Sequence, residues 1–567
     1  MMQAGSKPSD ATFGQRMIWG NDVGAFDNKL GEILTRLWHH GVYDGVVDQL
    51  LDDVLRPYEK LEALGQLEPF KASRFNEGNL RLGKDTRGRV IQLVADWLSS
   101  GTLVVANTGG GKTTLLSFLV LQLAALRCPV WLSENYKVYL RHLRPLFRQM
   151  GTDPVIVGAR DWRWNPLQSF LDNPNTQRTA AVDLLIRLLE LPSRARAMLN
   201  QGLDDLYRRF GNHMGNRAEW PTLIDLFEWV RTRPGLNPQA RDAIMDRLGS
   251  LIISVTPGCI AYRSGWNPAQ LAEFSIVFEM KGTSETAKQL LLGSLLRAVF
   301  DKEVERGLFN GPLRLVIAFD DSQRFFDAGG QGGFGELAPM DELAGVIRGT
   351  GIGLILLVQT MAGLSPRLLP NLGIKIMGRL GAAADYDQLG ADMGLSLQQK
   401  AWAKLHLQPP LFIGQTAHGW REPFAFRAPL IQLPAAVSAS EAAESLAPLN
   451  EMPTVFAEEF RNWTPDYSLG LSSKVGGNQP RGRSSSLDEA SIRFLRAVMQ
   501  NPGRPSSAYA RLARLGTKQA VGIRNRLVQA GFLRECPVAT SLRGRQSILL
   551  ELLPSAYAVV AETGGAL

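Results

Sequence analysis

The chain has 567 residues, 45% of them hydrophobic and 20% charged, with a formal charge of +8. Its length predicts two to four domains, and its composition is typical of a soluble globular protein. No apolar run approaches the roughly 20 residues of a membrane span, and the N-terminus lacks a signal-peptide core, so we expect a cytoplasmic protein. The cysteines are isolated from one another and from the histidines, which argues against a zinc site or a disulfide framework.

Residues 1–78 are expected to form a helical N-terminal docking domain. Apolar residues recur at helical spacing over 26–37 and over 46–55, and Pro57 is expected to break the second of these helices. This part of the sequence carries no evident catalytic motif.

A β-branched strand, a glycine-rich loop and an apolar helix follow one another over 101–119, GTLVVANTGGGKTTLLSFL. This order predicts a Walker A loop, in which small residues let backbone N–H groups approach phosphates at a helix N-terminus. Lys112 would add a point charge, and the Thr113 hydroxyl would ligate Mg²⁺. Ala106 replaces the first glycine of the pattern, and an ordinary glycine-rich turn is the alternative. The residues predicted to bind ATP are Asn107, Thr108, Gly109, Gly110, Gly111, Lys112, Thr113 and Thr114.

Residues 79–433 are predicted to form an α/β core around a parallel sheet. A strand at 129–132 is followed by Ser133-Glu134-Asn135, at the edge where open α/β sheets bind ligands. Residues from about 170 to 268 are mostly helical by pattern, and we interpret them as an inserted helical subdomain. The sheet resumes at 275–280, and a long helix follows from Ser284 to about Glu305.

Two carboxylates end the apolar strand in LVIAFDDSQ, residues 315–323. This pattern is typical of a Walker B motif, in which Asp320 would hold Mg²⁺ through water and Asp321 would activate the attacking water. The alternative is an acidic turn at a strand end. A second buried strand ends at Gln359, which a parallel sheet would place beside the γ-phosphate as a sensor, unless it only caps the strand.

Positive charge gathers near the C-terminus. Thirteen basic residues stand against four acidic ones between 481 and 551, so the rest of the chain is close to neutral. Residues 434–486 are interpreted as a linker, since 465–486 are rich in Gly, Ser and Pro. Residues 487–560 have the pattern of a winged helix-turn-helix, and a protein–protein adaptor is the alternative to DNA binding. The predicted DNA contacts are Lys518, Arg524 and Arg526 on its third helix and Arg543 and Arg545 at the wing tip.

From about residue 80 to 433 the chain resembles the HerA/FtsK superfamily of ring-forming motor ATPases. The resemblance implies a RecA-like P-loop NTPase fold, a hexamer with ATP and Mg²⁺ bound between subunits, and movement of double-stranded DNA. It also makes Arg348 and Arg379 candidate arginine fingers, although either could be a plain salt-bridge residue. The helical N-terminal region departs from HerA helicases, which carry a β-barrel there. The motifs that carry the resemblance are ANTGGGKTT, SENYKVYL, WNPL, VFEMKGTSETAKQLLLGSLL, the Asp-Asp-Ser-Gln strand end, Arg348 before the strand that ends in Gln359, and SPRLLPNLGIKIMGRL.

These features predict a cytoplasmic, hexameric ATPase that moves double-stranded DNA together with a nuclease or other effector, in DNA processing or in defence against foreign DNA. On this interpretation the catalytic residues are Lys112, Asp320, Asp321, Gln359, Arg348 and Arg379. Two other functions stay open: a regulatory ATPase scaffold that activates a partner enzyme, and a DNA-binding regulator switched by nucleotide.

Overall fold

The chain divides into two compact units, Met1–Gly470 and Leu471–Leu567. None of the described helices combines the length and the apolar character that crossing a bilayer takes. The structure is a computed structural model that describes residues 12–23, 25–26, 29–42, 44–63, 68–71, 74–85, 87–135, 139–307, 311–320, 350–362, 364, 368–466, 489–500, 508–529, 532–539 and 546–552.

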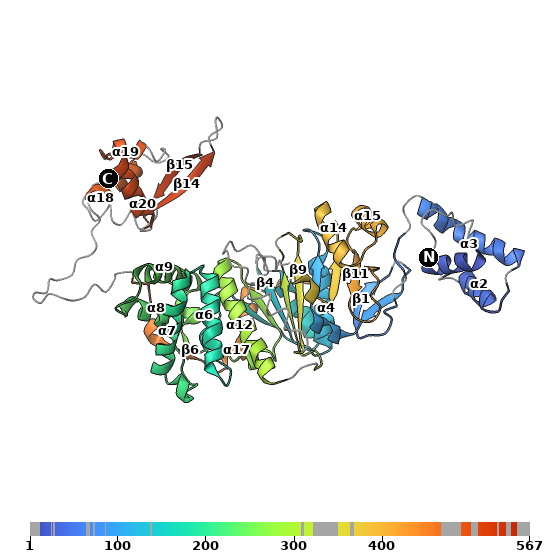
Figure 1. Ribbon diagram of the computed structural model, residues 1–567, viewed down its shortest axis with the longest axis horizontal. Coiled ribbons are helices and arrows are strands. Elements are labelled where there is room, and N and C mark those ends of the chain that lie inside the picture. The colour runs from blue at the N-terminus through green and yellow to red at the C-terminus, as the bar shows by residue number, and fades with distance from the viewer. Residues whose placement is uncertain are drawn as a thin grey trace, which may run out of the picture. The chain divides into compact units, whose positions relative to one another are not determined.

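One large sheet organises the first unit (Figure 1). Its strands in the described residues are β1 (Leu80–Lys84), β2 (Val90–Leu93), β3 (Thr102–Val105), β4 (Val130–Glu134), β5 (Val155–Gly158), β7 (Ile276–Glu279), β8 (Leu315–Asp320), β9 (Ile352–Val358), β10 (Ile374–Met377), β11 (Leu411–Thr416) and β12 (Phe424–Arg427). Their order across the sheet is β2-β1-β12-β11-β10-β3-β9-β8-β4-β7-β5. The described strands from β10 to β5 pair in parallel, and the other four continue the sheet through antiparallel pairings.

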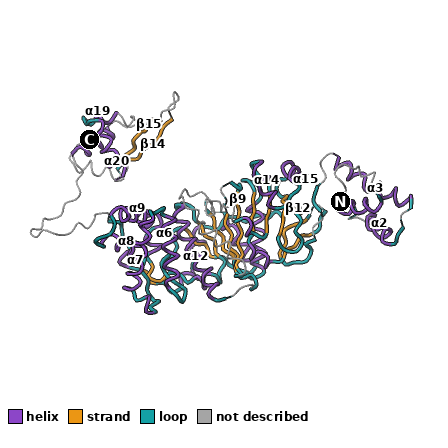
Figure 2. Tube along the Cα trace, in the orientation of Figure 1, coloured by secondary structure: helices purple, strands orange, loops and turns teal. Residues whose placement is uncertain are grey.

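A hydrophobic core covers each face of this sheet. Leu103 and Val105 of β3 face one core, and Val104 between them faces the other. Helix α12 (Glu285–Glu305) packs into the first core and α4 (Lys112–Ala125) into the second. Figure 2 shows the strands as a block with helices around it. This three-layer arrangement confirms the expected α/β core, whose parallel strands are apolar because both of their faces are buried.

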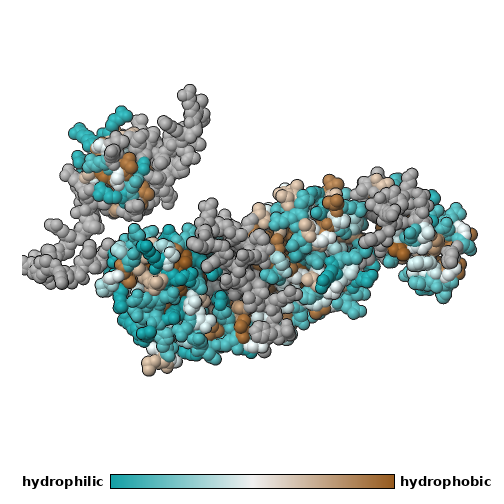
Figure 3. Space-filling model, viewed as in Figure 1, coloured by the Kyte–Doolittle hydropathy of each residue, from teal (hydrophilic) through white to brown (hydrophobic). Residues whose placement is uncertain are grey.

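Between β5 and β7 the chain forms a group of helices. The Thr222 side chain accepts the N–H of Asp225, whose carboxylate accepts the N–H of Thr222, so a capping box starts one of them. Asn237 caps another, and Pro238 is its first residue. The outer surface of this group is mostly hydrophilic (Figure 3). The longer helices are α6 (Pro174–Leu188), α7 (Ser193–Arg209), α8 (Leu223–Thr232) and α9 (Pro238–Val255).

The N-terminal region is helical and has a small core of its own. The expectation that Pro57 breaks a helix was wrong, because α3 runs through it. Leu51 and Leu55 are fully buried in this core, and their burial offsets the backbone hydrogen bond that proline cannot donate. The helices are α1 (Phe13–Asp22), α2 (Lys29–His39) and α3 (Gly45–Ala63).

Residues 434–466 are folded, which corrects the expectation that a linker begins at 434. The N–H of Ile156 in β5 donates to Ser445 Oγ at 2.8 Å, and Leu449 is fully buried. The sequence did not predict that this segment is folded, because it is rich in alanine and only a few of its side chains make these contacts. Its elements are α16 (Ala439–Glu444), α17 (Ala447–Asn450) and β13 (Val455–Phe456), and β13 pairs with β6 (Tyr262–Ser264).

The second unit has a core that includes Phe494, Tyr509 and Ile523. Its described elements follow the predicted order of three helices and an antiparallel strand pair. A winged helix-turn-helix remains a prediction. The elements are α18 (Glu489–Gln500), α19 (Tyr509–Leu512), α20 (Thr517–Gln529), β14 (Leu533–Ala539) and β15 (Gln546–Leu552).

Candidate nucleotide-binding site

The loop between β3 and α4 has the backbone that a phosphate cradle needs. Gly109 and Gly111 have φ angles of +75° and +85°, which residues with a side chain rarely adopt. A Cβ on Gly110 would lie 2.8 Å from the Cβ of Ala106. Glycine is therefore required at all three positions. Helix α4 begins directly after them, so its first N–H groups are left for an anion.

Lys112 lies against this loop. Its side chain is buried, and its Nζ donates to the carbonyl oxygens of Ala106 and, at 3.2 Å, of Asn107. Backbone carbonyl oxygens of the loop thus hold the Lys112 ammonium group over it. A phosphate bound on the loop would accept charge-assisted hydrogen bonds from the same ammonium group.

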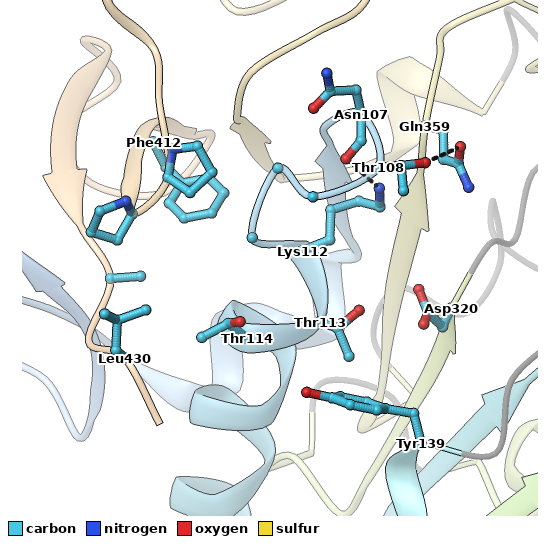
Figure 4. Close-up of a pocket in the computed structure, with 16 residues that line it drawn as sticks. Asn107, Thr108, Lys112, Thr113, Thr114, Tyr139, Asp320, Gln359, Phe412 and Leu430 are labelled. Carbon is cyan, nitrogen blue, oxygen red and sulfur yellow. Dashed lines mark hydrogen bonds between the residues drawn. The ribbon is translucent and has the colours of Figure 1, made fainter. Parts of the chain in front are cut away.

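A pocket of about 310 Å³ opens above the loop. Figure 4 shows Thr113, Asp320 and Gln359 on one side of the loop, and Phe412 and Leu430 on the other. The pocket therefore has one polar and one apolar end. The lining residues are Asn107, Thr108, Gly109, Gly110, Gly111, Lys112, Thr113, Thr114, Tyr139, Asp320, Gln359, Pro409, Pro410, Phe412, Ala428 and Leu430.

The strand order explains how the polar end is assembled. Strand β9 lies between β3 and β8, and all three are parallel, so the loop, Gln359 and Asp320 meet at one edge of the sheet. Thr108 Oγ1 donates to Gln359 Oε1 at 3.1 Å (Figure 4). The sheet, the loop and the two strand ends make the RecA-like P-loop NTPase fold.

Thr113 and Asp320 fit the Mg²⁺ of a nucleotide complex. In the described residues, no group of three or more His, Cys, Asp or Glu side chains could hold a metal ion by itself. The donor set at the polar end is one hydroxyl and one carboxylate, and Mg²⁺ usually combines so few protein ligands with phosphate oxygens and water. The glycine cradle beside them leaves room for those phosphates.

Glu134 is a buried acid at this edge, where the sequence placed it beside a ligand site without assigning it a role. It ends β4, where it lies in register with Asp320 on one side and Glu279 on the other. Its Oε2 accepts the N–H groups of Tyr139 and Leu140 at 2.7 and 3.0 Å. Glu134 thereby holds the backbone of Tyr139, a residue that lines the pocket, close to the end of β4.

Neighbouring cations balance part of this acidic edge. The Arg141 guanidinium donates to both carboxylate oxygens of Glu279, and this pairing raises the pKa of Arg141. The buried Lys288 of α12 donates to the carbonyl oxygen of Asn135 at 3.1 Å. Asn135 Nδ2 in turn donates to the backbone oxygen of Asp320 at 3.1 Å. Arg141 thus pairs with one strand-end carboxylate, and Lys288 and Asn135 hold the backbone at the ends of β4 and β8 by hydrogen bonds.

Glu134→Gln is expected to raise the melting temperature at pH 8 by about 1–3 °C. Burial raises the pKa of Glu134 although two backbone N–H groups lower it, and Asp320 and Glu279 raise it further. A carboxyl whose folded pKa exceeds its unfolded value costs stability while ionised, and the cost shrinks as pH falls through the folded pKa. Calorimetry should therefore show that the gain in melting temperature of Glu134→Gln over wild type becomes smaller as the pH falls from 8 to 5. Glu451→Gln, at an exposed glutamate, is the control. A variant less stable than wild type at pH 8 would contradict this assignment.

The remaining predicted site residues lie elsewhere or outside the described residues. Arg379 is exposed just beyond β10, and its carbonyl oxygen accepts the N–H of Asn107 at 2.7 Å, but its side chain does not line the pocket. Arg524 and Arg526 lie on α20 in the second unit. Outside the described residues are Asp321, Arg348, Arg543, Arg545 and the side chain of Lys518.

The sequence did not predict the apolar end of the pocket. Its residues lie in β11, just before β11 or just after β12, about 300 positions after the loop, and the sheet brings them to it. Tyr139 was missed as well, because a tyrosine after a strand has no distinctive spacing. The motif SENYKVYL includes Tyr139 but gave it no role, and no local pattern indicated that the apolar residues lie against the loop.

Neither a protein-family model nor a curated protein sequence matches the chain. Among solved structures, VirB4 of Thermoanaerobacter pseudethanolicus is 16% identical over 65% of this chain and 100% of that chain, with a TM-score of 0.49. The plasmid coupling protein TrwB in complex with ADP and Mg²⁺ is 13% identical over 66% and 94%, with a TM-score of 0.45. The genome packaging NTPase B204 from Sulfolobus turreted icosahedral virus 2, bound to ATP-gammaS, is 9% identical over 59% and 99%, with a TM-score of 0.28. At these identities and TM-scores the likenesses give no information on function.

Proposed function

We propose that this chain is a Mg²⁺-dependent ATPase of the HerA/FtsK superfamily that moves double-stranded DNA. The observation that supports it best is the meeting of Lys112, Asp320 and Gln359 in one pocket, at the ends of neighbouring parallel strands. A triphosphate seated on the loop would have its β- and γ-phosphates between the Lys112 ammonium and the polar end.

Lys112, Asp321 and the residues of the polar end would each have a separate role in hydrolysis. Lys112 balances the negative charge of the phosphates, and Thr113 and Asp320 would hold Mg²⁺, which when bound neutralises charge on the β- and γ-oxygens. Gln359 would orient the water that attacks the γ-phosphorus as the bond to the leaving ADP oxygen breaks. Asp321 is the proposed acceptor of that water's proton.

Gln359→Ala is expected to lower the rate of ATP turnover about 100-fold while changing the Kd for ADP less than about threefold. Gln359 lies on the γ-phosphate side of the loop and is held by Thr108, so its loss affects the reacting water more than the bound diphosphate. Phosphate release and calorimetric titration with ADP measure the two effects, and the exposed Gln270→Ala is the control. If binding and turnover fell together, Gln359 would be a binding residue and not a sensor.

A ring would bring an arginine of one subunit to the nucleotide of the next. Arg348 and Arg379 are the proposed fingers, and such residues contribute roughly 10³- to 10⁵-fold in rate. Light scattering coupled to gel filtration, with ATP present, tests the ring. A hexamer supports the assignment, and a stable monomer with full ATPase activity would contradict it.

The second unit is proposed to bind DNA as a winged helix-turn-helix, with α20 as the recognition helix. Its support is the cluster of basic residues between 481 and 551. A nuclease or other effector partner, a cytoplasmic location and a role in DNA processing or defence belong to the proposal as well.

ATP turnover by the purified full chain separates this proposal from the two alternatives. Turnover that duplex DNA accelerates supports the motor. Turnover that ignores DNA, but that a partner enzyme needs for its own activity, would identify a scaffold. Nucleotide-controlled binding to one DNA site without sustained turnover would identify a regulator.

A further inference from the structure

The apolar end of the pocket lies directly against the phosphate loop. A Cβ on Gly111 would come within 3.0 Å of the Phe412 ring and 3.6 Å of the Pro409 side chain. Thr113, Asp320 and Gln359 occupy the opposite side (Figure 4). A triphosphate whose γ-phosphate lies beside Asp320 and Gln359 must therefore extend toward Phe412, so its nucleoside would lie at the apolar end.

Among the residues that the structure describes, the side chains at this end of the pocket offer a base no hydrogen bond. The lining residues here are Pro409, Pro410, Phe412, Ala428 and Leu430, all of them apolar. Leu430 is 78% exposed beside the pocket, so it has apolar surface that a base could cover. The next polar lining residue, Thr114, lies on the first turn of α4, and its hydroxyl can serve as donor or acceptor to any base.

Several backbone groups of this end are also absent or already paired. Pro409 and Pro410 have no N–H to donate. The N–H of Leu411 donates to the Gln408 oxygen at 2.8 Å, and the N–H of Ala428 donates to the Pro410 oxygen at 2.9 Å. Adenine and guanine differ at the position where one carries an amino donor and the other a carbonyl acceptor. The groups available here give little basis for telling these apart.

We infer that the site takes purine nucleoside triphosphates in general and holds the base by apolar contact without recognising its hydrogen-bonding edge. This inference rests on the proposed function and specifies its substrate class. A site that hydrogen-bonds its ligand can reject an unmatched analogue by 10⁴- to 10⁵-fold. A site without such bonds binds adenine and guanine nucleotides with similar affinity, because both present the same flat apolar faces.

The test compares ADP with GDP by calorimetric titration and ATP with GTP in Mg²⁺-dependent turnover, using the full chain. We expect each pair to agree within about tenfold, the effect of one hydrogen bond of average strength. A preference of more than about tenfold for one purine would overturn the inference. If the preferred nucleotide still binds and is hydrolysed, the proposed function stands. If neither nucleotide binds or turns over, the proposed function itself fails.

Leu430→Ala tests the position of the base. We expect the Kd values for ADP and GDP to rise together by about three- to tenfold, because an apolar contact is lost that does not depend on the base. Leu397→Ala, which changes an 84% exposed leucine at the start of α15 (Leu397–His406), is the matched control. Unchanged affinities in Leu430→Ala, together with weaker binding in Tyr139→Ala, would place the base at the other end and overturn the inference.

Discussion

Lys112→Ala is expected to lower ATP turnover at least 100- to 1,000-fold, the usual effect of removing one preorganised group that stabilises transition-state charge. Lys112 is the only basic residue among the described residues that line the pocket. Its Nζ is already held over the loop by two carbonyl oxygens, so a phosphate meets a fixed charge. Phosphate release in Mg²⁺ measures the loss, and Lys404→Ala, at an ion pair with Asp387 outside the pocket, is the control.

The same variant tests whether ATP turnover and DNA binding belong to different units of the chain. Because the predicted DNA contacts lie in Leu471–Leu567, and Lys112 lies in Met1–Gly470, DNA affinity without nucleotide should change less than about twofold in Lys112→Ala. Fluorescence anisotropy with a labelled duplex measures it. Residual turnover near the wild-type rate would show that the loop does not hold the reacting phosphates.

The double variant Arg524→Ala, Arg526→Ala is expected to weaken duplex binding about 10- to 100-fold at 0.1 M salt. Each arginine that meets a phosphate releases counterions, so the slope of log K against log salt should also fall by about two. Both residues lie on α20, in the part of the chain that holds the excess of positive charge. Anisotropy titrations at several salt concentrations measure both quantities, and turnover without DNA should stay unchanged.

An exposed arginine of the first unit provides the matched control. Arg56 on α3 is 74% exposed in its side chain and lies near Asp53, so Arg56→Ala removes a surface cation without touching α20. We expect its salt slope to match that of wild type. If the α20 double variant also bound duplex DNA like wild type, the second unit would be better explained as a protein–protein adaptor.

The phosphate loop could be predicted from the sequence because its requirements are local. Gly109 and Gly111 need positive φ, Gly110 has no room for a side chain, and Lys112 follows immediately. Asp320 and Gln359 could be predicted too, since buried parallel strands end at one edge of a sheet. A short stretch of chain and one general rule of sheet geometry were enough for this end of the pocket.

The other features depend on contacts between distant parts of the chain. The apolar end exists because β11 and β12 join the sheet beside β10 and bring Phe412 to Gly111. Strand β5 was not predicted, because it is a run of only four residues. The N–H of its Ile156 donates to Ser445, almost 300 residues later in the chain. Pro57 stays in its helix because of tertiary packing that local propensity does not include. Register and packing of this kind have no signature at one position of the chain.

The measurement that tests the central claim most directly is ATP turnover as a function of duplex length at constant total base pairs. A motor that moves along DNA stays engaged longer on a longer track. The account therefore predicts that a duplex of about 20 base pairs stimulates turnover little and that one of several thousand base pairs stimulates it strongly. In Lys112→Ala, duplex DNA of either length should not stimulate turnover. Turnover that duplex DNA leaves unchanged, or that short and long duplexes stimulate equally, would contradict a translocating ATPase.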